Sequence, residues 1–390
     1  MVDYKSLLVA TIALSGTLGA TLNPTFSDSI ATIADCFDYQ IPVTTETEAL
    51  IWALPKFSEN YDVANFYASL IRRTTGPDII PFKPFSGSQN VTGHYTIGAT
   101  FCSPKNSTSR DKTVLLATHG LGFDRRYWIP NMNESEYSFA KYAVAEGYSV
   151  FMYDRLGTGM STKVSGYSDP QFSTHLAILR SLTNSLRAGD YTAAIGKPTN
   201  VVHVGHSFGS ILSHGFITQY PAESDGVVLT GIGFNASDFP AFFEASRLNI
   251  ANTVAPKKWK GLDSGYLAFA DIVGLAAGFF NPASFDGEAL WYANYIAQPP
   301  AAIEFLPPVE GTVGPTNFSG PLMLITGELD MGNCAGNCNG ILEYSTRKVF
   351  SKAKPFLTAV HPNAGHGFNF NPNATGAYGV IVDFLAESGF

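Results

Sequence analysis

The serine in the stretch VVHVGHSFGSIL, residues 201–212, has the surroundings that a nucleophile needs. Ser207 lies between Gly205 and Gly209 in a G-x-S-x-G pattern. A run of β-branched residues precedes the pattern and helix-forming residues follow it, so we expect a strand to turn sharply into a helix at Ser207. Glycines suit such a turn because a side chain there would strike the neighbouring strand or helix. An ordinary glycine-lined strand end is the alternative, since short patterns also arise by chance.

Four further stretches place glycines and polar residues at the expected ends of strands. They are LLATHGLGFDRRYW at 115–128, YDRLGTGMS at 153–161, LMLITGELD at 322–330 and HPNAGHGFNF at 361–370. Together with the serine motif, they resemble the α/β-hydrolase superfamily over about residues 90–390. The resemblance implies an α/β fold whose mostly parallel central sheet is flanked by helices and carries a helical cap insertion.

The resemblance implies a catalytic triad in the chain order Ser, Asp, His. Ser207 is the expected nucleophile, His366 the general base and Asp330 the acid that orients the imidazole. Glycines flank His366 on both sides, which leaves room for its ring to reach a serine. The GELD turn resembles the position from which the family presents its acid.

The H-G-x-G loop at residues 119–122 is implied to form half of an oxyanion hole. The backbone amide of Leu121 is the expected first donor and the amide of Phe208 the second. The YDRLGTGMS loop is expected to be structural, with Asp154 and Arg155 as internal partners.

Several residues compete for these roles. Glu328, and Asp238 after the preceding strand, are alternatives for the acid, and His361 is the alternative base. His203 and His206 flank the elbow, where we expect them to serve packing or substrate contact.

Strand-like and helix-like runs alternate along most of the chain, which predicts a parallel sheet covered on both faces. The expected strands are residues 92–102, 112–120, 148–155, 200–207, 226–234, 321–329 and 355–362. The expected helices are residues 136–147, 172–189, 211–223, 346–353 and 376–389. We therefore divide the chain into a signal peptide (1–20), an N-terminal extension (21–85), a first core segment (86–234), a helical cap (235–320) and a second core segment (321–390).

The cap interval contains no clear strand and is rich in aromatic residues, which favours an apolar substrate pocket. Phe242, Phe279 and Trp291 are the expected substrate contacts. The N-terminal extension is expected to be polar and helical, with its helix in residues 45–73.

Composition excludes several classes of partner. The 390 residues are 45% hydrophobic and 14% charged, and 24 basic against 32 acidic residues give a net charge of −8. No basic run marks a nucleic-acid or anionic membrane surface, so we expect neither partner. The chemistry of the triad requires no cofactor and no metal.

Three features predict secretion. Residues 1–20 have Lys5 before an apolar stretch and small residues at the end, as in a cleaved signal peptide. A membrane anchor is the alternative, but the apolar stretch is short for a membrane span, so stable membrane insertion is not expected. The four cysteines permit two disulfides, Cys334 with Cys338 and Cys36 with Cys102, whereas a zinc site is disfavoured by their spacing. The expected glycosylation sequons are Asn90, Asn106, Asn133, Asn235, Asn317 and Asn373.

These observations predict a secreted serine hydrolase that cleaves small-molecule carboxylic esters with an apolar or aromatic group. An amide hydrolase of the proline-iminopeptidase type is one alternative, for which Glu244, Glu288 or Glu304 would bind a free amine. Acyl transfer is a second, because it uses the same triad. A non-catalytic ligand-binding homologue is the alternative from another class.

Overall fold

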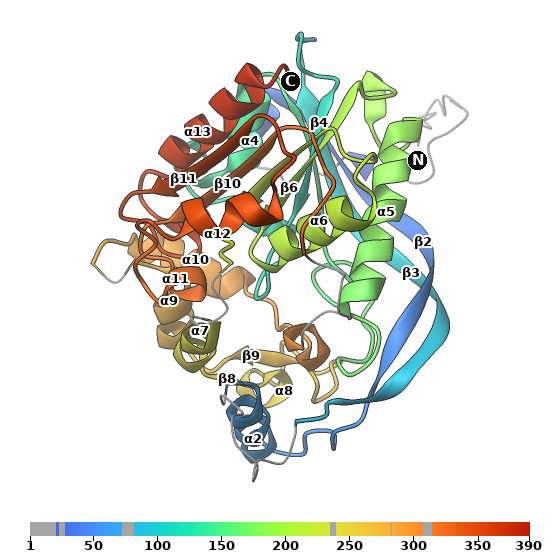
Figure 1. Cartoon of the computed structure of the whole chain (residues 1–390), viewed down its shortest axis with the longest axis vertical. Helices are drawn as coiled ribbons and strands as arrows, with labels where there is room; N and C mark the ends of the chain where they lie inside the picture. Colours follow the sequence, from blue (N-terminus) through green and yellow to red (C-terminus); the bar gives the residue numbers. More distant parts are fainter. Residues whose placement is uncertain (1–20, 23–27, 72–81, 235–238, 282, 307–313) are drawn as a thin grey trace, which may run out of the picture.

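The computed structural model describes residues 21–22, 28–71, 82–234, 239–281, 283–306 and 314–390. A central nine-stranded sheet runs through them in the order β1-β2-β3-β5-β4-β6-β7-β10-β11 (Figure 1). Its strands are β1 (Thr21–Leu22), β2 (Ala34–Trp52), β3 (Phe85–Pro104), β4 (Thr113–Thr118), β5 (Ser149–Tyr153), β6 (Asn200–His206), β7 (Gly226–Thr230), β10 (Leu322–Gly327) and β11 (Phe356–His361).

The strands from β5 to β11 are parallel, while β1, β2 and β3 pair antiparallel with their neighbours. All residues of β4, β5, β7 and β10 are buried, as expected for short apolar strands covered on both faces. The predicted mostly parallel sheet is confirmed, and each predicted strand overlaps an observed one.

Helices cover both faces of the sheet (Figure 1). On one face α4 packs against α13, and on the other α5 packs against α6. The helices of this core are α1 (Asp28–Ala31), α3 (Glu134–Tyr137), α4 (Phe139–Ala145), α5 (Phe172–Ala188), α6 (Phe208–Gln219), α11 (Met331–Cys334), α12 (Leu342–Val349) and α13 (Ala374–Glu387), with 3-10 turns η1 (Arg125–Tyr127), η2 (Ala193–Ile195) and η4 (Phe368–Phe370).

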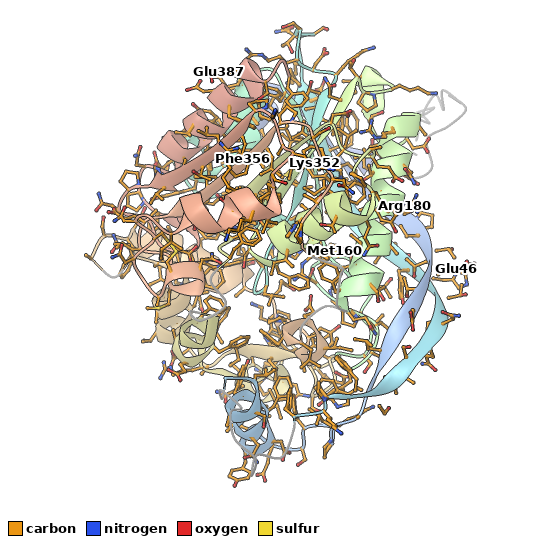
Figure 2. The ribbon with its side chains drawn as sticks, in the orientation of Figure 1. Glu46, Met160, Arg180, Lys352, Phe356 and Glu387 are labelled. Carbon is orange, nitrogen blue, oxygen red and sulfur yellow. A yellow bond between two sulfur atoms is a disulfide. The ribbon has the colours of Figure 1, made fainter. Side chains whose placement is uncertain are left out.

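The N-terminal extension differs from the expected helical segment. Residues 45–52, predicted as helix, belong to β2, and helix α2 (Asn60–Ile71) begins only at Asn60. β2 pairs with β3 along a long twisted ribbon that reaches beyond the core (Figure 1). On β2, Ile41 and Val43 are buried whereas Glu46 points outward (Figure 2), which is the alternation of a strand with one covered face.

The cap interval contains α7 (Phe239–Ser246), α8 (Ala251–Val254), α9 (Ile272–Phe279), α10 (Gly287–Ile296) and η3 (Ala302–Phe305). Contrary to the expected absence of strands, it also has a two-stranded sheet of β8 (Leu248–Ile250) and β9 (Leu267–Phe269). Helix α2 packs on β8 and α7, and the amide of Ile250 donates to Asn60 Oδ1 at 2.9 Å. The ribbon therefore carries part of the N-terminal extension into the cap.

Candidate active site

Ser207 occupies a sharp turn between β6 and α6. Its backbone angles are φ 53° and ψ −117°, which a serine adopts only where the surrounding structure holds it. A Cβ on Gly205 would lie 2.5 Å from the carbonyl oxygen of Gly209, and a Cβ on Gly209 would lie 2.1 Å from the carbonyl oxygen of Thr118. Both glycines are thus required by close backbone packing, in agreement with the elbow interpretation.

Two loops at the same edge of the sheet bring the other triad residues to Ser207. His366 Nε2 lies 2.9 Å from Ser207 Oγ. His366 Nδ1 lies 2.9 Å from each carboxylate oxygen of Asp330. With a proton on Nδ1 donated to the carboxylate, Nε2 is free to accept the serine proton. This is the geometry that nucleophilic catalysis by a serine requires.

Asp330 is held from several directions. It is fully buried at the end of β10 and accepts hydrogen bonds from the Thr326 hydroxyl at 2.6 Å and from Asn333 Nδ2 at 2.8 Å. It also caps α11, because its side chain accepts from the amide of Asn333 at 3.0 Å. Burial by itself raises the pKa of Asp330, but the facing His366 and the donated hydrogen bonds outweigh it and lower that pKa to about 2. The group is therefore a carboxylate at neutral pH.

The loop around His366 rests on the cap. The amide of Gly367 donates to the carbonyl of Phe279 at 2.8 Å. A Cβ on Gly365 would lie 2.7 Å from the backbone of Phe280, so the glycine before His366 permits this contact. Gly332 also lies close to the base, since a Cβ added at this position would be 3.1 Å from the His366 ring. The base is thereby fixed by backbone packing as well as by Asp330.

The expected oxyanion-hole residues lie beside the nucleophile. A Cβ on Gly120 would be 2.9 Å from Ser207 Cβ, so the H-G-x-G loop runs directly past the serine. Phe208 is the first residue of α6, where an amide has no partner within its helix. The amide of Leu121 follows Gly120 in the same loop. The arrangement can stabilise a negative oxygen that forms on a carbon attached to Ser207 Oγ.

His119 holds the H-G-x-G loop in place. Its Nε2 accepts the amide proton of Arg155 at 3.0 Å, so its Nδ1 carries the proton donated to the carbonyl of Gly120 at 2.8 Å. Burial lowers the pKa of His119 well below its usual value, which keeps the ring neutral.

Two of the three expected cap residues flank the base. The ring centroids of Phe242 and Phe279 lie 5.3 and 5.2 Å from that of His366. Trp291 does not join them, which corrects the prediction: 62% of it is exposed, and it stacks on Tyr295 along the outer side of α10. The sequence pattern did not distinguish the inner from the outer face of this short helix.

The competing acids and bases are placed elsewhere. Glu328 accepts from Asn339 Nδ2 and from the amide of Asn363. His361 is the last residue of β11, and its ring centroid lies 6.4 Å from that of Phe368. Asp238 lies outside the described residues. His203 Nδ1 and Nε2 contact Ser224 and Thr183 side chains. These contacts are structural.

His206 is also a structural neighbour of the site. Its ring stacks on Tyr127 with centroids 4.4 Å apart, and its Nδ1 lies 3.1 Å from the Thr230 hydroxyl. Its ring lies 5.1 Å from that of His366. Burial lowers the pKa of His206 well below its usual value, so it adds no positive charge beside the base.

The three candidate carboxylates for an amine have different surroundings. Glu244 and Glu288 are exposed on the cap. Glu304 is buried, and its carboxylate is bound by Arg155 and by His175. Of the three candidates, Glu304 is therefore already engaged by other side chains.

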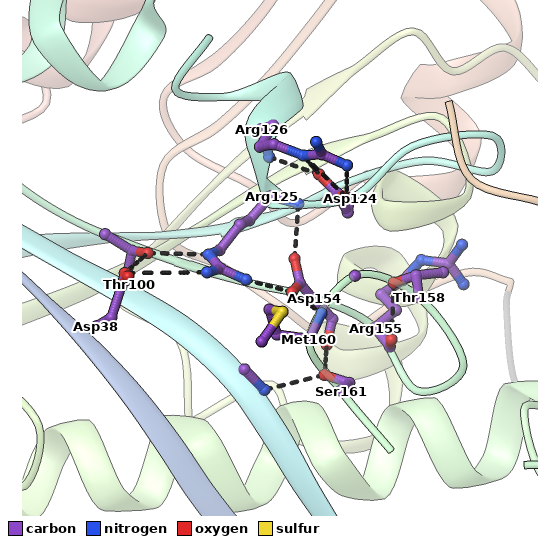
Figure 3. A network of polar contacts seen from close by, with 12 residues as sticks. Asp38, Thr100, Asp124, Arg125, Arg126, Asp154, Arg155, Thr158, Met160 and Ser161 are labelled. Atoms are coloured by element: carbon purple, nitrogen blue, oxygen red, sulfur yellow. Dashed lines mark hydrogen bonds and ion pairs between the residues drawn. The ribbon is translucent and has the colours of Figure 1, made fainter. Parts of the chain in front are cut away.

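In the YDRLGTGMS loop, Asp154 makes structural contacts within the turn, whereas Arg155 contacts the active site. Figure 3 shows the buried Asp154 carboxylate between Arg125 and Met160; it pairs with the guanidinium of Arg125 and accepts the Met160 amide at 2.7 Å. The Ser161 hydroxyl donates to the Asp154 carbonyl at 2.6 Å. Arg155 extends to the H-G-x-G loop, which the sequence did not indicate.

Both predicted disulfides are present. Cys36 and Cys102 join β2 to β3, and Cys334 and Cys338 close the turn after Asp330. The Cys338 amide donates to the carbonyl of Glu328 at 2.8 Å, so the bridged loop folds back onto the end of β10.

Most of the predicted glycosylation sequons lie on the surface. Five sequon asparagines are exposed, namely Asn90, Asn106, Asn133, Asn317 and Asn373, and Asn235 is outside the described residues. Within the ranges described above, no cluster of three or more His, Cys, Asp or Glu side chains has metal-binding geometry. In the same ranges, no helix has the length and apolarity to cross a bilayer.

Comparison with known proteins agrees with this geometry. The model of the Alpha/beta hydrolase family matches residues 114–377, which include Ser207, Asp330 and His366. The chain belongs to the alpha/beta hydrolase family. A search of curated proteins gave no significant match.

Solved structures of this hydrolase fold are similar over most of the chain. One is a thermophilic esterase from Thermogutta terrifontis, with 15% identity and a TM-score of 0.51 over 76% of this chain and 96% of that one. Another is a Mycobacterium tuberculosis protein provisionally assigned as a non-heme bromoperoxidase, with 17% identity and a TM-score of 0.50 over 76% and 96%. At these identities the likeness establishes the fold alone.

Proposed function

We propose that this hydrolase is a secreted serine esterase that cleaves carboxylic esters carrying an apolar or aromatic group. The observation that carries the proposal is the continuous hydrogen-bonded series from Asp330 through His366 to Ser207, beside the H-G-x-G loop and the first residue of α6. A carboxylic-acid derivative is the substrate class whose reaction uses all of these groups.

The reaction has two halves. In the first, Ser207 Oγ attacks the ester carbonyl carbon while His366 Nε2 takes the serine proton, and Asp330 stabilises the resulting imidazolium. The carbonyl oxygen becomes an oxyanion beside the amides of Leu121 and Phe208, where each donor contributes about 3–4 kcal/mol in comparable sites. His366 then protonates the departing alcohol, leaving an acyl group on Ser207.

In the second half, water replaces the alcohol. His366 removes a proton from the water as it attacks the acyl carbon, a second oxyanion forms in the same place, and its collapse returns the proton to Ser207 and releases the acid. No redox step occurs.

The cap supports the choice of an apolar group. The rings of Phe242 and Phe279 pack beside that of His366, and Phe269 packs against Phe279 with ring centroids 5.8 Å apart. Apolar walls with a few polar groups are typical of small-molecule sites. Two disulfides and five exposed sequon asparagines support secretion, because disulfides persist in oxidising compartments.

The test compares p-nitrophenyl esters of acetate, hexanoate and benzoate with the wild-type enzyme and four variants. Ser207→Ala and His366→Ala should each lose activity by about 10⁶-fold, and the double variant should be little worse than either, because the triad acts as a unit. His361→Ala is the matched control and should stay active. Loss in His361→Ala with retention in His366→Ala would refute the assignment of the base.

A further inference from the structure

One buried arginine contacts both halves of the oxyanion hole. Arg155 is fully buried, and its Nη2 donates to the carbonyl of Gly120 at 3.2 Å. On its other side the guanidinium lies over the ring of Phe208, with 4.8 Å from its carbon to the ring centroid. Arg155 therefore contacts the two segments that carry the expected oxyanion-hole amides, those of Leu121 and Phe208.

The contact with Gly120 determines the direction of the Leu121 amide. The Gly120 carbonyl and the Leu121 N–H belong to the same planar trans peptide, so they point in opposite directions. His119 Nδ1 and Arg155 Nη2 both donate to this carbonyl, at 2.8 and 3.2 Å. While these two hydrogen bonds to the Gly120 carbonyl are made, the Leu121 N–H points away from His119 and Arg155. Rotation of the peptide would replace the N–H donor by a carbonyl oxygen, which repels an oxyanion.

The cap supplies the counter-charge of Arg155. Glu304 in η3 pairs with Arg155 Nη1, and His175 Nε2 lies 3.1 Å from Glu304 Oε1 and 3.3 Å from Arg155 Nη1. The other oxygen of Glu304 accepts the amide of Ala301 at 2.7 Å. Burial raises the pKa of Glu304, but Arg155 and His175 outweigh burial and lower it, so the group stays ionised.

A buried charge without its partner is strongly unfavourable. The guanidinium of Arg155 is surrounded by protein, and Glu304 is its ion-pair partner across the boundary between core and cap. Removal of the Glu304 charge would leave the guanidinium to seek another partner, at the expense of its bond to Gly120.

We propose that Arg155 is a positioning residue that fixes the oxyanion hole, and that Glu304 of the cap holds Arg155 in the orientation that does so. The inference rests on the proposed hydrolase function and adds to it that the cap helps to form the reaction centre in addition to shaping the pocket.

The test uses Arg155→Lys and Glu304→Gln. Lysine keeps the charge but offers one compact ammonium, which cannot stack on Phe208 and bind Gly120 and Glu304 together. Glutamine keeps the shape of Glu304, but one of the two carboxylate oxygens becomes an NH2 group. That NH2 must face either the Ala301 N–H or the guanidinium of Arg155, so a donor faces a donor.

The chain offers a matched control on the outer surface of α5. Arg180, labelled in Figure 2, pairs with Glu223 at 2.6 and 3.0 Å and lies 4.0 Å from the ring centroid of Tyr220. Arg180 thus has the same two kinds of contact as Arg155, an ion pair with a glutamate and a contact with an aromatic ring, but it does not touch the active site. Arg180→Lys and Glu223→Gln should leave the kinetics unchanged.

Three kinetic quantities are measured for each variant: kcat per Ser207 labelled by a fluorophosphonate, KM for p-nitrophenyl acetate, and the inhibition constant of a trifluoromethyl ketone, which forms a tetrahedral oxyanion on the serine. The number of labelled sites and the melting temperature are recorded beside them. Arg155→Lys should lower kcat per labelled site about 10²-fold, the cost of one lost oxyanion donor. Its inhibition constant should rise by a similar factor, while KM changes less than about threefold. Glu304→Gln should shift the same quantities in the same direction by about tenfold.

The outcomes separate positioning from folding. A purely structural role would reduce the number of labelled sites or the melting temperature and leave kcat per site and the inhibition constant at wild-type values, and that result overturns the inference. If Arg155→Lys does not fold, the same comparison is made with Glu304→Gln. Wild-type protein that neither hydrolyses an ester nor is labelled would refute the proposed function itself, and the inference with it.

Discussion

Replacing Gly209 by alanine tests the packing that places the oxyanion hole. The added Cβ would lie 2.1 Å from the Thr118 carbonyl oxygen, 2.7 Å from the Thr118 carbonyl carbon and 2.9 Å from the His119 carbonyl oxygen. All three are backbone atoms at the end of β4, so no side chain can rotate away. The start of α6 must therefore move relative to the H-G-x-G loop.

The size of the movement follows from the contact distances. Ordinary contact begins near 3.4 Å, so the shortest contact must open by about 1.3 Å. A displacement of about 1 Å between reacting groups can cost about 10²-fold in rate, and we expect that loss in kcat for Gly209→Ala. Overpacking also destabilises the fold by about 1–3 kcal/mol, which outweighs the gain of about 1 kcal/mol from replacing glycine in a helix.

Gly287→Ala is the control, because it also lies at the start of a helix and its Cβ would meet no atom within 4 Å. Turnover of p-nitrophenyl acetate per labelled serine is measured together with the melting temperature for both variants. Gly287→Ala should match the wild type in turnover. A Gly209→Ala enzyme with turnover within about threefold of wild type would show that the elbow tolerates the shift, and would refute the reasoning.

Three further predictions address the acid, the disulfide and the cap. The pKa of Asp330 is lowered from 3.8 to about 2 in the folded protein, so its charge contributes about 2 kcal/mol above pH 4 that is mostly lost as the pH falls to 2. The difference in unfolding free energy between wild type and Asp330→Asn, followed by urea titration, should shrink over that interval; a constant difference would contradict the low pKa. Replacing Cys334 and Cys338 by serine should lower kcat but change the melting temperature little, because a short loop removes little unfolded-state entropy; unchanged kcat would show that the bridge does not support Asp330. Phe279→Ala should change the ratio of benzoate to acetate ester hydrolysis, whereas the exposed Trp291→Ala should not, and equal effects would remove the basis for placing selectivity at Phe279.

The triad loops were predictable because each motif ends a short apolar strand. Ser207 follows β6, Asp330 follows β10 and His366 lies in the loop after β11, so parallel pairing brings all three to one edge of the sheet. Gly205 and Gly209 were also predictable as turn residues, because close backbone packing leaves no room for a side chain at either position.

Contacts between distant segments were not predictable in the same way. Arg155 and Glu304 are far apart in the chain, and nothing in either local sequence indicates that cap docking buries them together. Asn333 left a weak signal, since it follows Asp330 at the spacing of a capped helix. In β2, Pro42 is tolerated because this part of the strand has β3 as a neighbour on one side and is not paired with β1 on the other.

The central claim is that Ser207 forms an acyl-enzyme with His366 as its base. The most direct measurement is mass spectrometry of the protein quenched during the first turnover of p-nitrophenyl acetate, followed by mapping of the modified peptide. We expect one acetyl group, on Ser207, in the wild-type enzyme, in an amount that matches the initial burst of nitrophenol, and none in Ser207→Ala. Turnover with no acyl group on Ser207, or an acyl group on another residue at the same rate, would contradict the account.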